Sequence, residues 1–201
     1  QFQNSFSERP PVMLSITTTD QNFIVQPVSQ NYFQIFELPQ AFAVDVDALS
    51  EKYRQLQSEH HPDRFAGAEE GERLQAVQLT SLINEAYETL KIPMKRAAYL
   101  LSLSGIDTER VDQADLGMDL LMEQMQLRES LAELPADESA LPELESLKKE
   151  VTEKMQERQT HFAQLIASNE VDAARKLFHE MQFLHKLIAE IDQGEEQRLG
   201  Y

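Results

Sequence analysis

The apolar residues of this chain recur every three or four positions from Asn31 onward, and this spacing most constrains the fold. In the clearest run, the apolar residues are Leu79, Leu82, Ile83, Ala86, Tyr87 and Leu90. Residues at these intervals share one face of an α-helix, so the run predicts a long amphipathic helix. No segment alternates apolar and polar residues for long enough to indicate a sheet. The sequence therefore predicts an all-α fold.

Prolines and glycines divide the first part of this helical pattern into separate helices. Asp45 or Asp47 can cap a helix that runs to His60. Pro62 ends that helix, because proline lacks the backbone donor that a helix interior needs. The long helix described above follows, and a short fourth helix closes at Gly105, a residue favoured after helix ends.

The second part of the pattern predicts a three-helix bundle. Residues 106–114 interrupt the periodicity, and we interpret them as a joint between two domains. Three helices are predicted after it, at residues 115–134, 141–167 and 171–192. Their short connections favour antiparallel packing. In contrast, residues 1–30 are polar and have no sustained period. We interpret this segment as a poorly ordered leader or an added segment, with a short strand at 23–25 as the alternative.

The composition argues against several classes of function. The 201 residues include no cysteine, which excludes disulfides, thiolate catalysis and iron-sulfur clusters ligated by cysteines of this chain. The formal net charge is -17, so a nucleic acid backbone would be repelled. No apolar run approaches the roughly 18 residues that a membrane span needs. Most of the negative charge lies after residue 105, which indicates that the two halves have different partners.

The segment Glu59–Phe65, EHHPDRF, places two histidines and an aspartate in a loop between two amphipathic helices. A metal-dependent enzyme could use His60, His61 and Asp63, but it would need a further ligand, and adjacent histidines diverge on a helix. General acid-base catalysis would need a reacting group within hydrogen-bond reach, and the local sequence offers no nucleophile. A purely structural alternative is that His61 caps a helix end and Asp63 accepts hydrogen bonds from loop amides.

The helix predicted at residues 115–134 has two apolar faces. One face contains Leu116, Leu120, Leu127, Leu131 and Leu134, and the other contains Met118, Leu121, Met122 and Met125. A bundle helix needs only one buried face. The second face is therefore either covered by another part of the chain or exposed as a binding surface, for which the flexible methionine side chain is well suited. Phe183 falls outside the apolar stripe of the last helix, which makes it a candidate interface residue.

The tripeptide His61-Pro62-Asp63, lying between two helices, resembles the signature of the J domain of DnaJ-type co-chaperones. Other segments extend the resemblance to HscB, the J-domain co-chaperone of iron-sulfur cluster assembly, known as Jac in mitochondria. These segments are NYFQIFELP (31–39), LQSEHHPDRF (56–65), INEAYETLKIPMKRAAYLLSLSG (83–105), LLMEQMQLRESL (120–131) and FLHKL (183–187). The resemblance covers about residues 31–201.

The resemblance implies a domain organisation and a function. Residues 31–105 would form the J domain, 106–114 a linker and 115–201 a scaffold-binding three-helix bundle. The bundle would hold the iron-sulfur scaffold IscU, and the J domain would stimulate ATP hydrolysis by the DnaK-like chaperone HscA. No enzyme active site, cofactor or metal would belong to this chain. A general J-domain co-chaperone for a different client is the alternative.

The resemblance also implies which residues bind each partner. Those for the chaperone are His61, Pro62, Asp63, Arg64, Lys52 and Arg54. Those for the scaffold are Leu121, Met122, Met125, Gln126, Glu129, Glu133 and Phe183. Met125 stands where leucine is frequent in the family and Gln126 where an acid is frequent, so we expect altered binding strength. The absence of the metal-binding cysteines of some eukaryotic relatives favours a bacterial, cytoplasmic protein.

Overall fold

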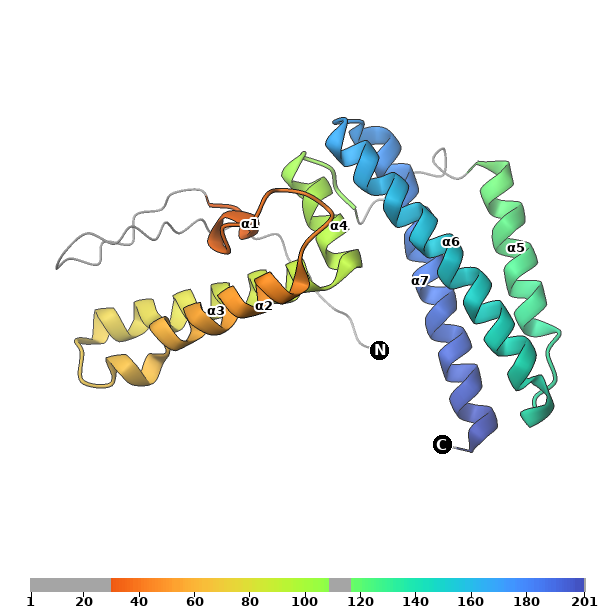
Figure 1. Cartoon of the computed structure of the whole chain (residues 1–201), viewed down its shortest axis with the longest axis horizontal. Helices are drawn as coiled ribbons and strands as arrows, with labels where there is room; N and C mark the ends of the chain where they lie inside the picture. The colour runs from red at the N-terminus through yellow and green to blue at the C-terminus, as the bar shows by residue number, and fades with distance from the viewer. Residues whose placement is uncertain (1–29, 109–116, 201) are drawn as a thin grey trace. The chain divides into compact units, whose positions relative to one another are not determined.

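A computed structural model describes residues 30–108 and 117–200 of the chain (Figure 1). All regular elements in these residues are helical, which confirms the all-α prediction. None of the described helices is long and apolar enough to cross a membrane. The residues form two compact units: the first ends at Lys95, and the second comprises Ala41–Ala43 and the chain from Arg96 onward. The predicted leader and most of the predicted joint lie outside the described residues.

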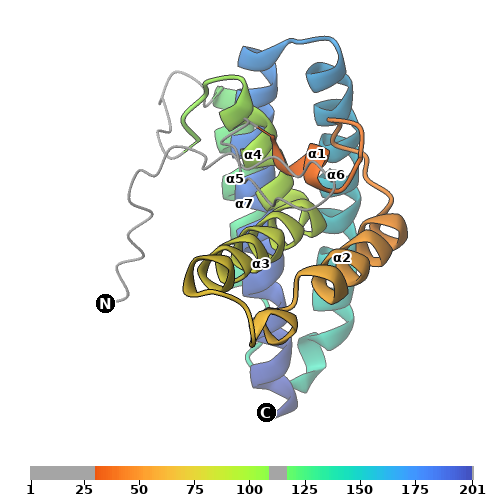
Figure 2. The ribbon, with the colours of Figure 1, turned by 90° about the vertical axis from the view of Figure 1, so that its left-hand side faces the viewer.

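The first unit is built on a helical hairpin. Its elements are α1 (Tyr32–Ile35), α2 (Val46–His60), the short 3-10 helix η1 (Pro62–Phe65) and α3 (Glu70–Lys91). Asp45 caps α2 by accepting hydrogen bonds from the backbone N–H groups of Asp47 and Ala48, each at 3.0 Å. Helices α2 and α3 lie side by side, and the loop with η1 joins them at one end (Figures 1 and 2).

Contacts between α2 and α3 hold the hairpin together. Leu49 and Ile83 are fully buried in its core. The Tyr53 and Tyr87 rings stack with their centroids 4.0 Å apart. Near the loop, the hydroxyl of Thr80 donates a hydrogen bond of 2.9 Å to the carbonyl of His60. The end of α2 is therefore fixed to α3 directly before the His61-Pro62-Asp63 tripeptide begins.

The second unit contains the predicted three-helix bundle. Its elements are α5 (Met118–Ala132), the short 3-10 helix η3 (Glu138–Ala140), α6 (Leu141–Ala167) and α7 (Val171–Leu199), together with most of α4 (Pro93–Leu103). Helix α7 extends beyond the predicted end at residue 192. The residues after Asp192 include no proline, and the helix tolerates Gly194 and ends only where Gly200 adopts a φ of 77°.

Helices α6 and α7 provide most of the buried surface of this bundle. Six residues of α6 and eight of α7 are buried, whereas Leu127 is the single buried residue of α5. Leu120 and Leu131 lie half-buried on the same side of α5, so the predicted inner face is confirmed for these two residues, and Leu134 is half-buried just after the helix ends. Leu116 lies outside the described residues. Helix α5 thus covers the α6 and α7 pair through a narrow apolar contact.

The short segment Ala41–Ala43 belongs to the second unit through Phe42. The ring of Phe42 meets Phe162 of α6 edge to face, with their centroids 5.1 Å apart. The buried guanidinium of Arg96 donates a hydrogen bond of 2.6 Å to the Phe42 carbonyl and lies over the Phe42 ring. Burial lowers the pKa of Arg96 from its usual value. This arginine thus satisfies a backbone carbonyl that would otherwise be buried without a partner.

Candidate functional site

The His61-Pro62-Asp63 tripeptide forms an ordered and exposed turn. His61 ends α2 and caps η1, and Pro62 occupies the first position of η1, where its missing N–H costs nothing. The Nδ1 atom of His61 accepts a hydrogen bond of 3.3 Å from the backbone N–H of Asp63. The side chains of His61 and Asp63 are nevertheless 53% and 91% exposed. The turn therefore presents an imidazole and a carboxylate at the surface, on a backbone held by the cap.

The basic residues near this turn do not all lie on one surface. Arg54, Ser58 and His61 are spaced at i, i+4 and i+7, so they lie along one face of α2. Arg64 reaches back to the same face and donates a hydrogen bond of 3.2 Å to the Ser58 carbonyl. Lys52 lies on nearly the opposite face and forms an ion pair of 2.6 Å with Glu37. Arg54 and Arg64 are therefore better placed beside the turn than Lys52.

The second apolar face of α5 is exposed, and we call it the methionine ridge. It consists of Met118, Leu121, Met122 and Met125, whose side chains are 72%, 37%, 52% and 71% exposed. The described residues cover them only in part, so the alternative that this face belongs to the core does not hold for the described part of the chain. Large apolar side chains gathered on one surface mark an interaction site.

An acidic groove borders the methionine ridge on the side of α6. Gln126, Glu129 and Glu133 are exposed along α5, as the second face predicts. They line a groove of about 590 Å³, whose opposite wall is formed by Glu150 and Lys154 of α6. The ridge therefore has an apolar centre and a predominantly acidic border on this side.

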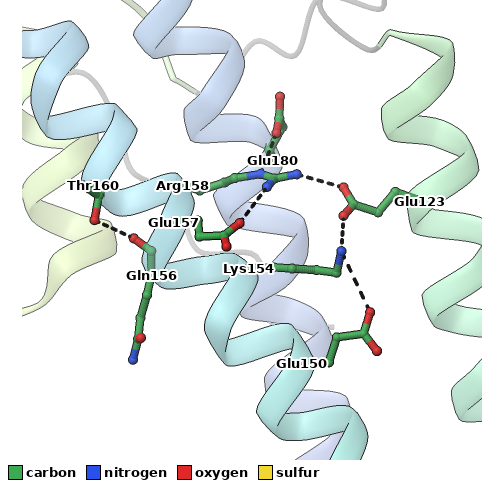
Figure 3. Close-up of polar contacts among 8 residues, drawn as sticks. All are labelled: Glu123, Glu150, Lys154, Gln156, Glu157, Arg158, Thr160 and Glu180. Atoms are coloured by element: carbon green, nitrogen blue, oxygen red, sulfur yellow. Dashed lines mark hydrogen bonds and ion pairs between the residues drawn. The ribbon is translucent and has the colours of Figure 1, made fainter.

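Partly buried charges join α5 to α6, and α6 to α7 (Figure 3). Glu123 of α5 accepts hydrogen bonds of 2.9 Å from Lys154 and 3.0 Å from Arg158, both on α6. Arg158 also donates a hydrogen bond of 3.0 Å to Glu180 of α7. Hydrogen bonding to Glu123 raises the pKa of Lys154 above its usual value. Because these side chains are mostly buried, their attraction is screened less than that of surface pairs.

Phe183 of α7 flanks the ridge on the other side. Its ring is half-buried, and the guanidinium of Arg128 lies 5.6 Å from the ring centroid. Arg128 belongs to α5, so this contact joins the two helices next to the ridge. Phe183 is therefore partly accessible, as its position outside the buried stripe predicts. Leu177, Met181, Leu184 and Ile191 of that stripe are buried.

The described residues offer no ready metal centre. Among residues 30–108 and 117–200, no group of three histidine, aspartate or glutamate side chains is arranged to hold an ion. His60 is buried, whereas His61 and Asp63 are exposed, and burial lowers the pKa of His60. His179 is also buried, while His161 and His185 are exposed on their helices.

Comparison with known proteins identifies both halves of the chain. Residues 31–99 match the DnaJ domain, and residues 116–192 match the family described as the HSCB C-terminal oligomerisation domain. The co-chaperone protein HscB homolog of Vibrio cholerae is 40% identical over 170 residues, which are 85% of this chain and 99% of that protein. The chain belongs to the HscB co-chaperone family. An HscB homolog of Neisseria meningitidis is 39% identical over 160 residues, which are 80% of this chain and 96% of that protein.

Solved structures of the HscB family share the fold. Chaperone HscB from Vibrio cholerae has a TM-score of 0.74 and 39% identity, and the match covers 84% of this chain and 99% of that one. Human co-chaperone protein HscB has a TM-score of 0.79 and 26% identity, with 94% and 95% of the two chains covered. The J domain and the C-terminal HscB domain predicted from the sequence are thereby confirmed. A J-domain co-chaperone acts with a DnaK-type chaperone.

The sequence alone did not reveal the charged residues that support the methionine ridge. Lys154 and Arg158 are spaced at i and i+4, which places them on one face of α6. That spacing indicates two cations side by side on α6, but the sequence does not show which carboxylate contacts them. Arg128 was also missed, because its role depends on the approach of Phe183 from another helix.

Proposed function

We propose that this HscB-family protein binds the iron-sulfur scaffold IscU through the methionine ridge and Phe183. We also propose that it stimulates the ATPase of the DnaK-like chaperone HscA through His61, Pro62 and Asp63, in the cytoplasm of a bacterium. The observation that supports the proposal is the presence of two exposed surfaces with different chemistry on the two units of one chain. The turn is rigid and polar, whereas the ridge is apolar and adaptable.

The turn acts on the chaperone without chemistry of its own. A ligand changes a two-state partner by binding one state better than the other. His61 and Asp63 supply a donor and an acceptor whose positions are set by the cap and by Pro62. Arg54 and Arg64 add positive charge beside them. These side chains select the chaperone conformation that hydrolyses ATP.

The ridge holds the scaffold by burying apolar surface. Covering one methionine or leucine side chain contributes roughly 1.5–3 kcal/mol when the burial is complete. The side chains are already partly covered, so the gain from each is smaller, and association costs reduce the total further. Glu129 and Glu133 favour a basic surface around the apolar contact. The scaffold is thus expected to offer the ridge an apolar patch of its own, with basic residues beside that patch.

A single-turnover ATPase assay of HscA, with and without IscU, tests both halves of the proposal. We expect His61→Gln to abolish stimulation without unfolding the protein, because the exposed imidazole makes few internal contacts. Met122→Ala should raise the Kd for IscU roughly ten-fold and weaken only the scaffold-dependent stimulation. His161→Gln and Leu74→Ala are matched controls, since both residues are exposed and lie outside the two surfaces.

Each half can fail separately in this assay. Normal stimulation by His61→Gln would show that the turn does not act on HscA. Normal stimulation by Met122→Ala, together with unchanged IscU binding, would move the scaffold site away from the ridge. A wild-type protein that stimulates HscA but binds no IscU would be a J-domain co-chaperone for a different client.

A further inference from the structure

Three of the seven methionines of the chain lie on the methionine ridge. Met118, Met122 and Met125 are each more than half exposed. In contrast, Met155 of α6 and Met181 of α7 are buried in the bundle. In the described part of the second unit, the thioethers that meet solvent are therefore gathered on one surface.

The spacing of the three exposed methionines places their side chains on one side of α5. At about 100° per residue, positions 118, 122 and 125 fall within an arc of about 60°. Along the helix axis, the first and the last are separated by roughly 10 Å. A partner that covers the ridge therefore contacts all three thioethers at once.

The composition of the chain concentrates sulfur oxidation on these side chains. The chain has no cysteine and no tryptophan, so it offers no thiolate that would react with an oxidant first. A thioether is oxidised to a sulfoxide by the loss of two electrons. The net charge of -17 opposes the approach of anionic oxidants, whereas a neutral hydroperoxide is not repelled. The exposed methionine sulfurs are thus the main targets of a neutral hydroperoxide.

We propose that the methionine ridge is a site of reversible oxidation, at which a neutral hydroperoxide converts Met118, Met122 and Met125 to methionine sulfoxide and thereby prevents docking of the partner. A sulfur lone pair attacks one peroxide oxygen, and the S–O bond forms as the O–O bond breaks. The leaving oxygen takes up the peroxide proton and departs as water or an alcohol. The sulfur loses two electrons, and the peroxide gains them. This inference rests on the proposed function, in which the partner is the scaffold.

Oxidation changes the chemical character of the ridge. A sulfoxide is polar and chiral, and its oxygen accepts hydrogen bonds strongly. Burying such an acceptor against an apolar patch costs free energy unless a donor meets it. Glu129 and Glu133 at the border are themselves acceptors. Leu121 remains apolar, but it is the least exposed residue of the ridge. The oxidised ridge therefore no longer offers a continuous apolar surface.

Reduction restores the original surface. Methionine sulfoxide reductases return the sulfoxide to the thioether, one enzyme for each epimer at sulfur. In this step two thiols are oxidised to a disulfide, and the sulfoxide oxygen leaves as water. The three side chains are exposed and therefore accessible to these enzymes. The oxidation thus acts as a switch on docking.

Peptide mapping by mass spectrometry tests where oxidation occurs. The full-length protein is exposed briefly to hydrogen peroxide. We expect Met118 and Met125 to gain an oxygen about five-fold faster than Met155 and Met181, because the buried sulfurs are shielded. Met122 is less exposed than the other two ridge methionines and should react at an intermediate rate. Equal rates at the ridge and in the core would overturn the assignment.

Calorimetry with purified IscU tests the effect on docking. The protein is oxidised alone, the peroxide is removed, and untreated IscU is then added. We expect oxidation to raise the Kd about ten-fold, and treatment with both reductases and dithiothreitol to return it to within about two-fold of the untreated value. A Kd that stays high after the sulfoxides are reduced would show irreversible damage and would overturn the switch.

A variant that combines Met118→Leu, Met122→Leu and Met125→Leu separates the ridge from the other sulfurs. Leucine has a similar volume but no sulfur. Relative to its own untreated sample, this variant should show no change of Kd after peroxide. Met94→Leu is the matched control, because Met94 is half-buried on α4 outside the ridge. It should lose binding on oxidation as the wild type does. An equal loss in the triple variant would place the effect elsewhere and overturn the inference.

The outcomes distinguish this inference from the proposed function. Tight IscU binding by the wild type, with the same Kd after oxidation of the ridge, would overturn the switch alone. Absence of IscU binding by the untreated wild type would overturn the proposed function and the effect on docking with it. The peptide map decides the site of oxidation independently of IscU.

Discussion

At the scale of single residues, neighbouring side chains in this chain have very different roles. His60 and His61 are adjacent, yet His60 is buried against α3 while His61 is exposed in the turn. The helix ends between them, so Pro62 and the cap direct the two rings to different environments. The pair that looks like a metal site in the sequence therefore separates into a buried residue and an exposed residue.

The buried His60 should make the stability of the protein depend on pH. Burial, the largest cause, lowers its pKa in the folded state below the usual 6.5. Between these two pKa values the unfolded chain binds the additional proton, so the free energy of unfolding falls as the pH drops below about 6.5. We expect His60→Gln to flatten this decline. Urea unfolding at pH 7.5 and 5.5 measures the difference in the free energy of unfolding between the two pH values.

Exposed His161 provides the control for this experiment. His161→Gln should keep the wild-type difference between the two pH values, because its imidazole lies on the surface of α6. An unchanged difference in His60→Gln would show that other groups cause the decline.

At the scale of elements, the helix that carries the ridge is the least buried helix of the bundle. Only Leu127 of α5 is buried, and the ion pairs of Glu123 with two cations on α6 add to the attachment of this helix (Figure 3). An apolar surface left free for a partner cannot also hold the helix to the bundle. The ion pairs therefore compensate for the side chains that the ridge exposes.

Removing the Glu123 carboxylate should loosen α5 selectively. Glu123→Gln leaves Lys154 and Arg158 partly buried with one fewer partner, and we expect a loss of roughly 1 kcal/mol. Backbone amides of α5 should then exchange hydrogen about five-fold faster, while those of α6 and α7 change little. Glu153→Gln is the control, because Glu153 pairs with Lys149 only at 4.0 Å on the surface. Equal exchange rates in both variants would show that apolar contacts alone attach α5 to the bundle.

The helices were predictable from the sequence, but the contacts between them were not. Apolar spacing and breaker residues such as Pro62 and Gly105 depend only on nearby positions, so they located the elements and the second apolar face of α5, but not whether that face is exposed. The end of α7 was predicted too early, because its last turns are polar and lack an apolar stripe. The contacts of Glu123 and of Arg128 depend on which helix faces meet, and no local pattern contains that information.

At the scale of the whole molecule, the two surfaces lie on separate units of one chain. The turn belongs to the first unit and the ridge to the second. Linking two binding modules raises the effective concentration of the second binding event, provided that both partners can bind together. Scaffold-dependent stimulation should therefore require both surfaces in the same polypeptide.

Mixing two defective variants tests this requirement. His61→Gln retains the ridge, and Met122→Ala retains the turn, so an equimolar mixture contains both surfaces on different molecules. We expect the mixture to give no more scaffold-dependent ATPase stimulation than Met122→Ala alone, because the scaffold is held by molecules that cannot act on the chaperone. A mixture of wild type and His61→Gln is the control and should retain stimulation. Full recovery in the first mixture would show that the turn and the ridge act independently.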